Sequence, residues 1–183
     1  MGNIAKTILF FCFVLVLIVL LFLTIFFLSF KTDYKNFVFE SATQNDVSSS
    51  LVFAVIKAES KFNKNAKSTA NAIGLMQVKL STANYMLALE NKSPISETEL
   101  FDPQTNIELG TKYLKYLSKK FDDIQVVICA YNAGETVVND WLKNSDYSKD
   151  GKSLDKIPYQ ETENYLQKVL FNQKIYKKIF KFD

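Results

Sequence analysis

Residues 47–77, VSSSLVFAVIKAESKFNKNAKSTANAIGLMQ, decide the fold that this sequence predicts. Apolar residues in its first half recur at the spacing of one helix face. They are Val47, Leu51, Val52, Val55 and Ile56. With Asp46 as the N-cap, the pattern predicts a helix that ends near Ser60. Glu59 continues the apolar face, so a helix directs its carboxylate toward buried neighbours.

The position of Glu59 has two explanations. Burial disfavours a charged carboxylate and raises its pKa, and a carboxyl that stays protonated near neutral pH can donate a proton in catalysis. Alternatively, a glutamate at a helix end extends to water or bonds a backbone amide. Position alone favours this second, structural explanation, so further residues must decide.

Downstream of this stretch, the pattern predicts more helices and an all-α domain. A turn at Asp102-Pro103 precedes an amphipathic helix, and a loop is predicted over residues 144–158, which are polar and contain Gly151 and Pro158. No strand-type alternation and no internal repeat stands out. The predicted helices include Ile107 to Leu117, Ile124 to Ala133 closed by Gly134, Val137 to Trp141, and a last one from near Gln160.

The N-terminus predicts a membrane anchor. Of the 23 residues from 8 to 30, only Thr24 and Ser29 are clearly polar. As a helix they extend about 35 Å, which is enough to cross a hydrocarbon core of about 30 Å. A cleaved signal is the alternative, but its apolar part is about 7 to 15 residues and ends at a small-residue site. The flanking lysines do not fix the orientation.

The predicted organisation therefore has four parts. A short tail covers residues 1–7, the transmembrane anchor 8–30, a linker of mixed charged and aromatic residues 31–46, and the helical domain 47–183.

Composition excludes several classes of function. All 22 basic residues are lysines and the sequence has no histidine, so a histidine triad, a histidine metal site and a bidentate arginine clamp are impossible. The two cysteines, Cys12 and Cys129, lie in separate apolar patterns and suggest neither a disulfide framework nor a zinc site. No metal or cofactor is expected. The near-neutral charge after the anchor does not favour a nucleic-acid partner. Acid–base chemistry is left to carboxylates, tyrosine or lysine.

Four motifs in order carry a resemblance to a known family. They are Glu59-Ser60 with Phe62, Ala66, Ser68, Ala72 and Gly74-Leu75-Met76-Gln77; Asp102-Pro103 with Asn106-Ile107 and Gly110; Ala130-Tyr131-Asn132-Ala133-Gly134; and Pro158-Tyr159 with Glu161-Thr162 and Tyr165. Together they resemble the signature of lytic transglycosylases of the soluble-transglycosylase (SLT) type, whose domain is lysozyme-like, as in goose-type lysozyme. The sequence departs from the pattern at Asn71, often glycine, and at Lys79-Leu80, where proline is common. Both departures suggest differences in backbone shape.

The resemblance implies a reaction and one central residue. Glu59 would act first as acid and then as base, cleaving the β-1,4 bond between N-acetylmuramic acid and N-acetylglucosamine without water and leaving a 1,6-anhydro end. A typical glycosidase needs a second carboxylate about 5 to 9.5 Å away, and none is evident on the Glu59 face. Peptidoglycan is the implied partner, reached from a bacterial cytoplasmic membrane with the domain on its outer, periplasmic or cell-wall side.

The resemblance also implies substrate-binding residues, each with a structural alternative. Ser68 would bond the N-acetyl group, or cap a loop. Glu161 would bind saccharide, or favour the dipole of its helix. The remaining implied residues are Met76 and Gln77 in the cleft wall, with core packing as the stronger rival for Met76; Tyr131 and Asn132 in the groove floor; and Tyr165. Either Tyr165 or Tyr131 would bond Glu59, with packing of the last helix as the alternative for Tyr165.

Three other functions remain as alternatives. A goose-type lysozyme has the same fold and acid but transfers the sugar to water. A non-catalytic peptidoglycan-binding scaffold would keep the fold without the reaction. An anchored helical domain that binds membrane proteins would leave the four motifs unexplained.

Overall fold

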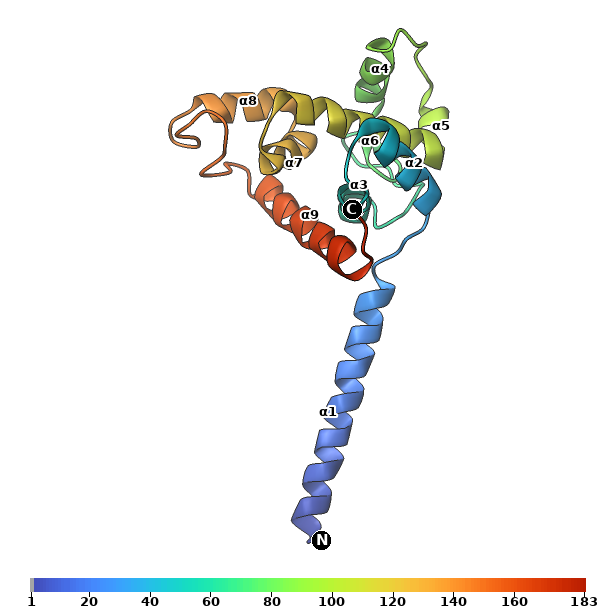
Figure 1. Cartoon of the computed structure of the whole chain (residues 1–183), viewed down its shortest axis with the longest axis vertical. Coiled ribbons are helices and arrows are strands. Elements are labelled where there is room, and N and C mark those ends of the chain that lie inside the picture. The colour runs from blue at the N-terminus through green and yellow to red at the C-terminus, as the bar shows by residue number, and fades with distance from the viewer. Residues whose placement is uncertain (1) are drawn as a thin grey trace. The chain divides into compact units, whose positions relative to one another are not determined.

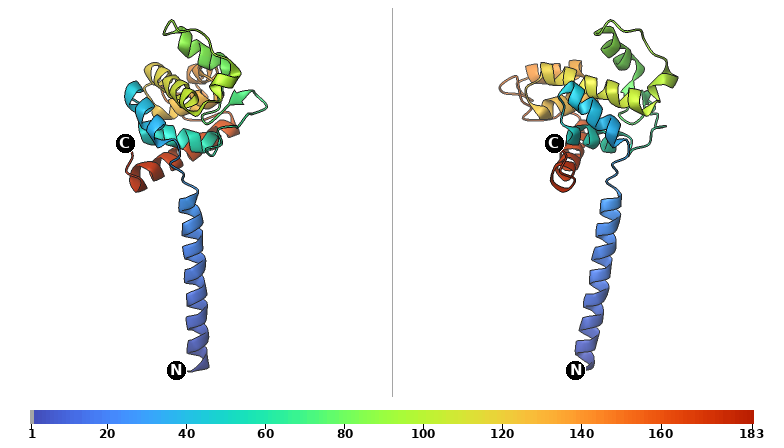
Figure 2. Two further views of the ribbon diagram at one scale, coloured as in Figure 1. Left: turned by 90° about the vertical axis from the view of Figure 1, so that its right-hand side faces the viewer. Right: turned by 45° about the vertical axis from the view of Figure 1, so that its right-hand side comes forward.

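A computed structural model describes residues 2–183, which divide between Thr32 and Asp33 into two compact units (Figures 1 and 2). The first unit is the helix α1, Asn3–Leu28, in which no side chain is buried. Its 26 residues extend about 39 Å, and its mean hydropathy reaches 3.4. The helix therefore has the length and composition of a membrane span, beginning five residues before the predicted anchor.

The prediction of a linker over residues 31–46 is corrected by the second helix. Helix α2, Lys35–Asn45, packs on α3 and α6, and Val38, Ser41 and Ala42 are buried. These three residues have helical spacing, but two of them are small or polar, so no apolar stripe stands out in the sequence. The folded unit begins at Asp33 rather than at residue 47.

The cap predicted for the next helix is corrected as well. Asp46 ends α2 in a left-handed conformation with φ of 50°. Ser48 is the N-cap of α3, Ser49–Glu59, and its hydroxyl accepts a hydrogen bond from the Leu51 amide. Every α3 residue except Lys57 and Glu59 is buried, so this helix is the centre of the core.

The other predicted helices are confirmed. Helix α3 packs mainly on α9, while α6 contacts α2, α4 and α7, and α7 contacts α8 and α9. The polar segment 144–158 contains no helix, as predicted. The confirmed helices are α6 (Pro103–Lys120), α7 (Ile124–Ala133), α8 (Glu135–Lys143) and α9 (Gln160–Ile179).

Four elements between α3 and α6 were absent from the prediction. They are a hairpin of β1 (Ala72–Ile73) and β2 (Val78–Lys79), and the helices α4 (Leu80–Ala88) and α5 (Glu97–Leu100). The strands are antiparallel, with Ala72 opposite Lys79. Two-residue strands are too short to show an alternating pattern. This hairpin matters because its turn, which includes Gly74 and Gln77, faces the candidate site.

Candidate active site

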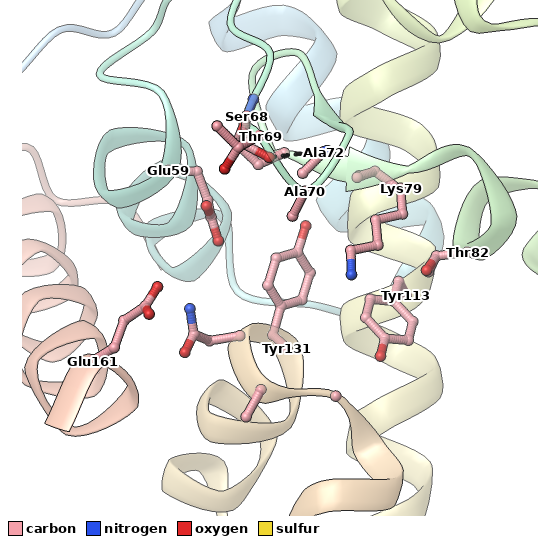
Figure 3. A pocket seen from close by; sticks show the side chains of 15 residues that line it. Glu59, Ser68, Thr69, Ala70, Ala72, Lys79, Thr82, Tyr113, Tyr131 and Glu161 are labelled. Atoms are coloured by element: carbon pink, nitrogen blue, oxygen red, sulfur yellow. Dashed lines mark hydrogen bonds between the residues drawn. The ribbon is translucent and has the colours of Figure 1, made fainter. Parts of the chain in front are cut away.

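A pocket of about 410 Å³ lies beside the C-terminal end of α3 (Figure 3). The hairpin and the loop before it form one wall, and α7 and the first turn of α9 contribute residues on another. The lining residues are Glu59, Ser68, Thr69, Ala70, Ala72, Gln77, Val78, Lys79, Thr82, Tyr113, Tyr131, Asn132, Ala133, Gly134 and Glu161. Elements far apart in the sequence thus converge on one cavity.

Glu59 is the last residue of α3 and points into this pocket. Burial raises the pKa of its carboxyl to about 7. The position of Glu59 at the end of α3 also favours the protonated carboxyl, because the C-terminal end of a helix dipole disfavours a negative charge. At neutral pH a substantial fraction of Glu59 is therefore protonated, as a general acid requires. The catalytic explanation of Glu59 gains a physical basis that its sequence position alone did not give.

Helix α9 supplies the groups that adjust this acid. The buried Tyr165 hydroxyl lies beside the Glu59 carboxyl and lowers its pKa, as does the positive charge of Lys168. The charge of Glu161 acts in the opposite direction and raises the pKa. Lys168 is held in place by a 3.2 Å hydrogen bond to the Ala58 carbonyl. Burial thus raises the pKa of Glu59, and three residues spaced along α9 adjust it.

The hairpin turn is held by Asn106, a fully buried residue of α6. Its amide donates to the carbonyls of Ile73 and Leu100 at 2.9 and 3.0 Å, and its oxygen accepts from the Met76 amide at 2.8 Å. Gly74 has φ of 75°, and a Cβ there would overlap the Asn106 side chain. The Asn and Gly of two separate motifs therefore form one structural unit.

Met76 does not line the pocket, so its predicted contact with sugar is replaced by core packing. Its exposed fraction is 0%, and its sulfur lies where a Cβ on Gly110 would be only 2.6 Å away. Its backbone carbonyl accepts a 2.9 Å hydrogen bond from the Tyr131 hydroxyl. Met76 joins the hairpin to the core because α6 has a glycine opposite it.

Gln77 and Ser68 both line the pocket but are used differently. The Gln77 amide nitrogen donates to the carbonyls of Ala66 and Gly74 at 3.1 and 2.9 Å, so it fixes the loop. The Ser68 hydroxyl oxygen accepts from the Ala72 amide at 3.0 Å, which leaves its hydrogen able to donate. Ser68 is thus both a loop cap and a possible ligand of a substrate acceptor.

Tyr131 and Asn132 lie at the end of α7, where the motif AYNAG places them in the pocket. The Tyr131 ring packs against Tyr113 at 5.4 Å. The Asn132 oxygen accepts from the Thr162 hydroxyl at 2.7 Å. No residue among 2–183 accepts a hydrogen bond from the Asn132 amide nitrogen, which leaves that donor for a ligand.

The structure brings together six of the eight residues predicted for the site: Glu59, Ser68, Gln77, Tyr131, Asn132 and Glu161. Tyr165 does not line the pocket and is 8% exposed, so it acts on Glu59 rather than on a ligand. Sequence reasoning missed Tyr113, Thr82 and Lys79. Tyr113 belongs to the apolar stripe of α6, which hid its role, whereas Lys79 was visible only as a departure from the family pattern.

The comparisons with known proteins agree with this geometry. The family model described as "Transglycosylase SLT domain" matches residues 36–154. The soluble lytic murein transglycosylase of Salmonella typhimurium is 32% identical over 154 residues, which cover 81% of this chain and 23% of that protein. The membrane-bound lytic murein transglycosylase E of Buchnera aphidicola is 37% identical, covering 60% of this chain and 55% of that protein.

Solved structures show the same likeness. Lytic transglycosylase Slt of Pseudomonas aeruginosa, solved as an inactive mutant, has a TM-score of 0.72 and 30% identity, covering 83% of this chain and 25% of that one. A complex of the 70-kDa soluble lytic transglycosylase with bulgecin A has a TM-score of 0.73 and 29% identity, over 82% of this chain and 25% of that one.

The chain belongs to the transglycosylase SLT domain family. Its fold is the lysozyme-like helical fold of that family, as predicted. It spans about a quarter of the length of the first curated relatives that it matches.

Proposed function

We propose that this protein is a peptidoglycan lytic transglycosylase with Glu59 as its acid and base. The observation that carries the proposal is a carboxyl with a pKa of about 7, directed into a pocket that the family motifs line. A carboxyl of ordinary pKa would be almost fully ionised at neutral pH and would be a poor proton donor.

The proposed reaction has two proton transfers. Protonated Glu59 gives its proton to the oxygen that joins N-acetylmuramic acid to N-acetylglucosamine, and the bond from the muramic C1 to that oxygen breaks. The 6-hydroxyl of the same muramic acid then attacks C1 and returns its proton to Glu59. The products are a new N-acetylglucosamine end and a 1,6-anhydro end, and no water is consumed.

Two polar groups of the pocket support this reaction. The hydrogen of the Ser68 hydroxyl is free to bond the N-acetyl carbonyl and so to hold the N-acetyl group beside C1. The N-acetyl group itself then stabilises the positive charge that develops at C1. The free Asn132 amide and the Glu161 carboxylate can bond sugar hydroxyls. Tyr165 is buried and does not line the pocket, so it lowers the pKa of Glu59 without contacting the sugar.

We further propose that α1 anchors the enzyme in the bacterial cytoplasmic membrane, with Asp33–Asp183 on the outer side. The apolar surface of α1 supports a single span, and a relative is named as membrane-bound. The substrate implied for the pocket lies outside the cytoplasm, which selects this orientation.

The experiment incubates the full chain in detergent with purified sacculi and identifies the released muropeptides by mass spectrometry. We expect 1,6-anhydromuropeptides from the wild type and none from Glu59→Gln. Glu163→Gln is the matched control, because Glu163 is exposed on α9 and does not line the pocket. Products with reducing ends would identify a lysozyme instead, and no products at all would favour a scaffold. Bulgecin A, which a solved relative binds, should inhibit release.

A further inference from the structure

Lys79 is a cation within the pocket that has no partner in the protein. It is the last residue of β2, and its side chain extends into the cavity on the side of Tyr113 and Tyr131 (Figure 3). The side chain is exposed, and it forms no ion pair or hydrogen bond with any of residues 2–183. It is also the only lysine among the residues that line the pocket in this part of the chain.

Several other lysines of the unit Asp33–Asp183 form ion pairs. Lys120 lies 2.9 Å from Glu135, Lys67 lies 2.6 Å from Glu97, and Lys112 lies 2.8 Å from both Glu90 and Glu108. The charges that act on the pKa of Glu59 are those of Lys168, which does not line the pocket, and Glu161, which does. The ammonium of Lys79 is therefore left available to an anionic group of whatever occupies the cavity.

The chemistry of peptidoglycan restricts what that group can be. The hydroxyl and N-acetyl groups of its sugars are neutral. Its anionic groups are carboxylates: the lactyl carboxylate of muramic acid when no peptide is attached, and the free carboxylates of the stem peptide when one is. A lysine ammonium on a flexible stem binds such a group as a compact point charge.

We propose that Lys79 is a substrate-binding residue that recognises a carboxylate of the glycan strand, and that it thereby selects which strands the enzyme cuts. This inference rests on the proposed transglycosylase function. It also revises the expectation that the departure at Lys79-Leu80 concerns backbone shape, because the side chain itself enters the pocket.

The test uses the full chain in detergent with four soluble glycan preparations. Two are peptide-free strands, one with the lactyl carboxylate and one with it converted to a methylamide. Two carry stem peptides, one with free carboxylates and one with them amidated. Lys79→Met removes the charge and keeps an apolar stem, Lys79→Arg keeps the charge, and Lys156→Met, at an exposed lysine outside the pocket, is the control.

We expect Lys79→Met to lower kcat/KM about tenfold on a carboxylate-bearing strand, chiefly by raising KM. The amidated counterpart should be cut at the wild-type rate, and Lys79→Arg should keep most of the activity. A loss on peptide-free strands identifies the lactyl carboxylate as the ligand, and a loss on peptide-bearing strands identifies the stem peptide.

Two results would overturn the inference. One is an unchanged kcat/KM for Lys79→Met on all four preparations. The other is an equal loss on charged and amidated strands, which a merely structural role would produce. In both cases an active wild type leaves the proposed function intact. A wild type that releases no 1,6-anhydro ends from any preparation overturns the proposed function and this inference together.

Discussion

The hairpin wall and the α9 wall of the pocket are built on different physical principles. In the hairpin wall, polar side chains form hydrogen bonds to the backbone and so fix its shape. Asn106 and Gln77 together bond the carbonyls of four residues and the amide of Met76. The α9 wall comprises Glu161, which lines the pocket, together with Tyr165 and Lys168, which act on Glu59 without lining it. These three residues hold little backbone of the site and act on the pKa of Glu59 through charge and polarity.

The hairpin wall therefore determines the shape of the cavity, and the α9 wall adjusts the protonation of Glu59. Changes in the hairpin wall should alter folding and the form of the cavity, while changes in the α9 wall should move the pH dependence of the reaction with little effect on the fold. Glu59 lies between the two walls and should respond to both, so it gives the largest effect.

Glu59→Gln should lower kcat/KM by about 10² to 10⁴-fold, because it removes the proton donor. The variant should also be more stable at alkaline pH. The folded pKa of about 7 lies above the usual 4.5, so ionisation costs nothing at pH 4 and destabilises the wild type progressively as pH rises from 4.5 to 7. The gain at pH 8 should be about 3 kcal/mol. Thermal unfolding of both chains at pH 4 and pH 8 measures it, and equal gains at both pH values would contradict the raised pKa.

Asn106→Ala should destabilise the unit Asp33–Asp183 by about 3 kcal/mol, because three hydrogen bonds are lost and their buried partners are left unpaired. Activity should fall as the hairpin loosens. Urea unfolding measures the effect, with Asn65→Ala, at an exposed position, expected to stay within about 0.5 kcal/mol of the wild type. A similar stability for both variants would show that the hairpin does not depend on α6.

Tyr165→Phe should move the pH profile to the alkaline side. The wild-type kcat/KM is expected to decline as pH rises through about 7, where Glu59 loses its proton. Tyr165 lowers that pKa, so without its hydroxyl the decline begins at higher pH. Stability should change little, since the hydroxyl is buried without a hydrogen bond of normal geometry in residues 2–183. A shift toward acid pH would assign Tyr165 a different role.

Glu161→Gln should shift the pH profile of kcat/KM least, and toward acid pH rather than alkaline pH. Removing its negative charge lowers the pKa of Glu59, so the decline of kcat/KM should begin at lower pH. Because Glu161 is exposed, the shift should be smaller than that of Tyr165→Phe and should shrink in high salt. Profiles at two salt concentrations test this, and a loss of activity without any shift would indicate that Glu161 only binds sugar.

Prediction from sequence succeeded where a long periodic pattern exists. Helix α7 has the predicted bounds, and the last helix begins at Gln160 as predicted, because a wide apolar face and a clear end signal set both. It failed for α2, whose buried face includes Ser41 and Ala42, and for the hairpin, whose strands have two residues each. In these elements tertiary contacts, rather than local pattern, determine the structure.

The candidate site divides in the same way. Motif order pointed to Glu59, Ser68 and Asn132, but it also placed Met76 in the cleft wall. A motif does not show which of two adjacent residues faces the pocket. Only packing shows that Met76 lies behind the wall while Gln77, the next residue, faces the pocket.

The sequence by itself determined that this protein has an apolar N-terminal helix, an all-α domain and a glutamate on the apolar face of a helix. These features follow from periodicity and order along the chain. Only the tertiary structure raises the pKa of Glu59 and brings Lys79 to the same cavity. A pKa depends on burial and on charges brought close in space, and Tyr165, Lys168 and Glu161 come beside Glu59 only when α9 packs on α3.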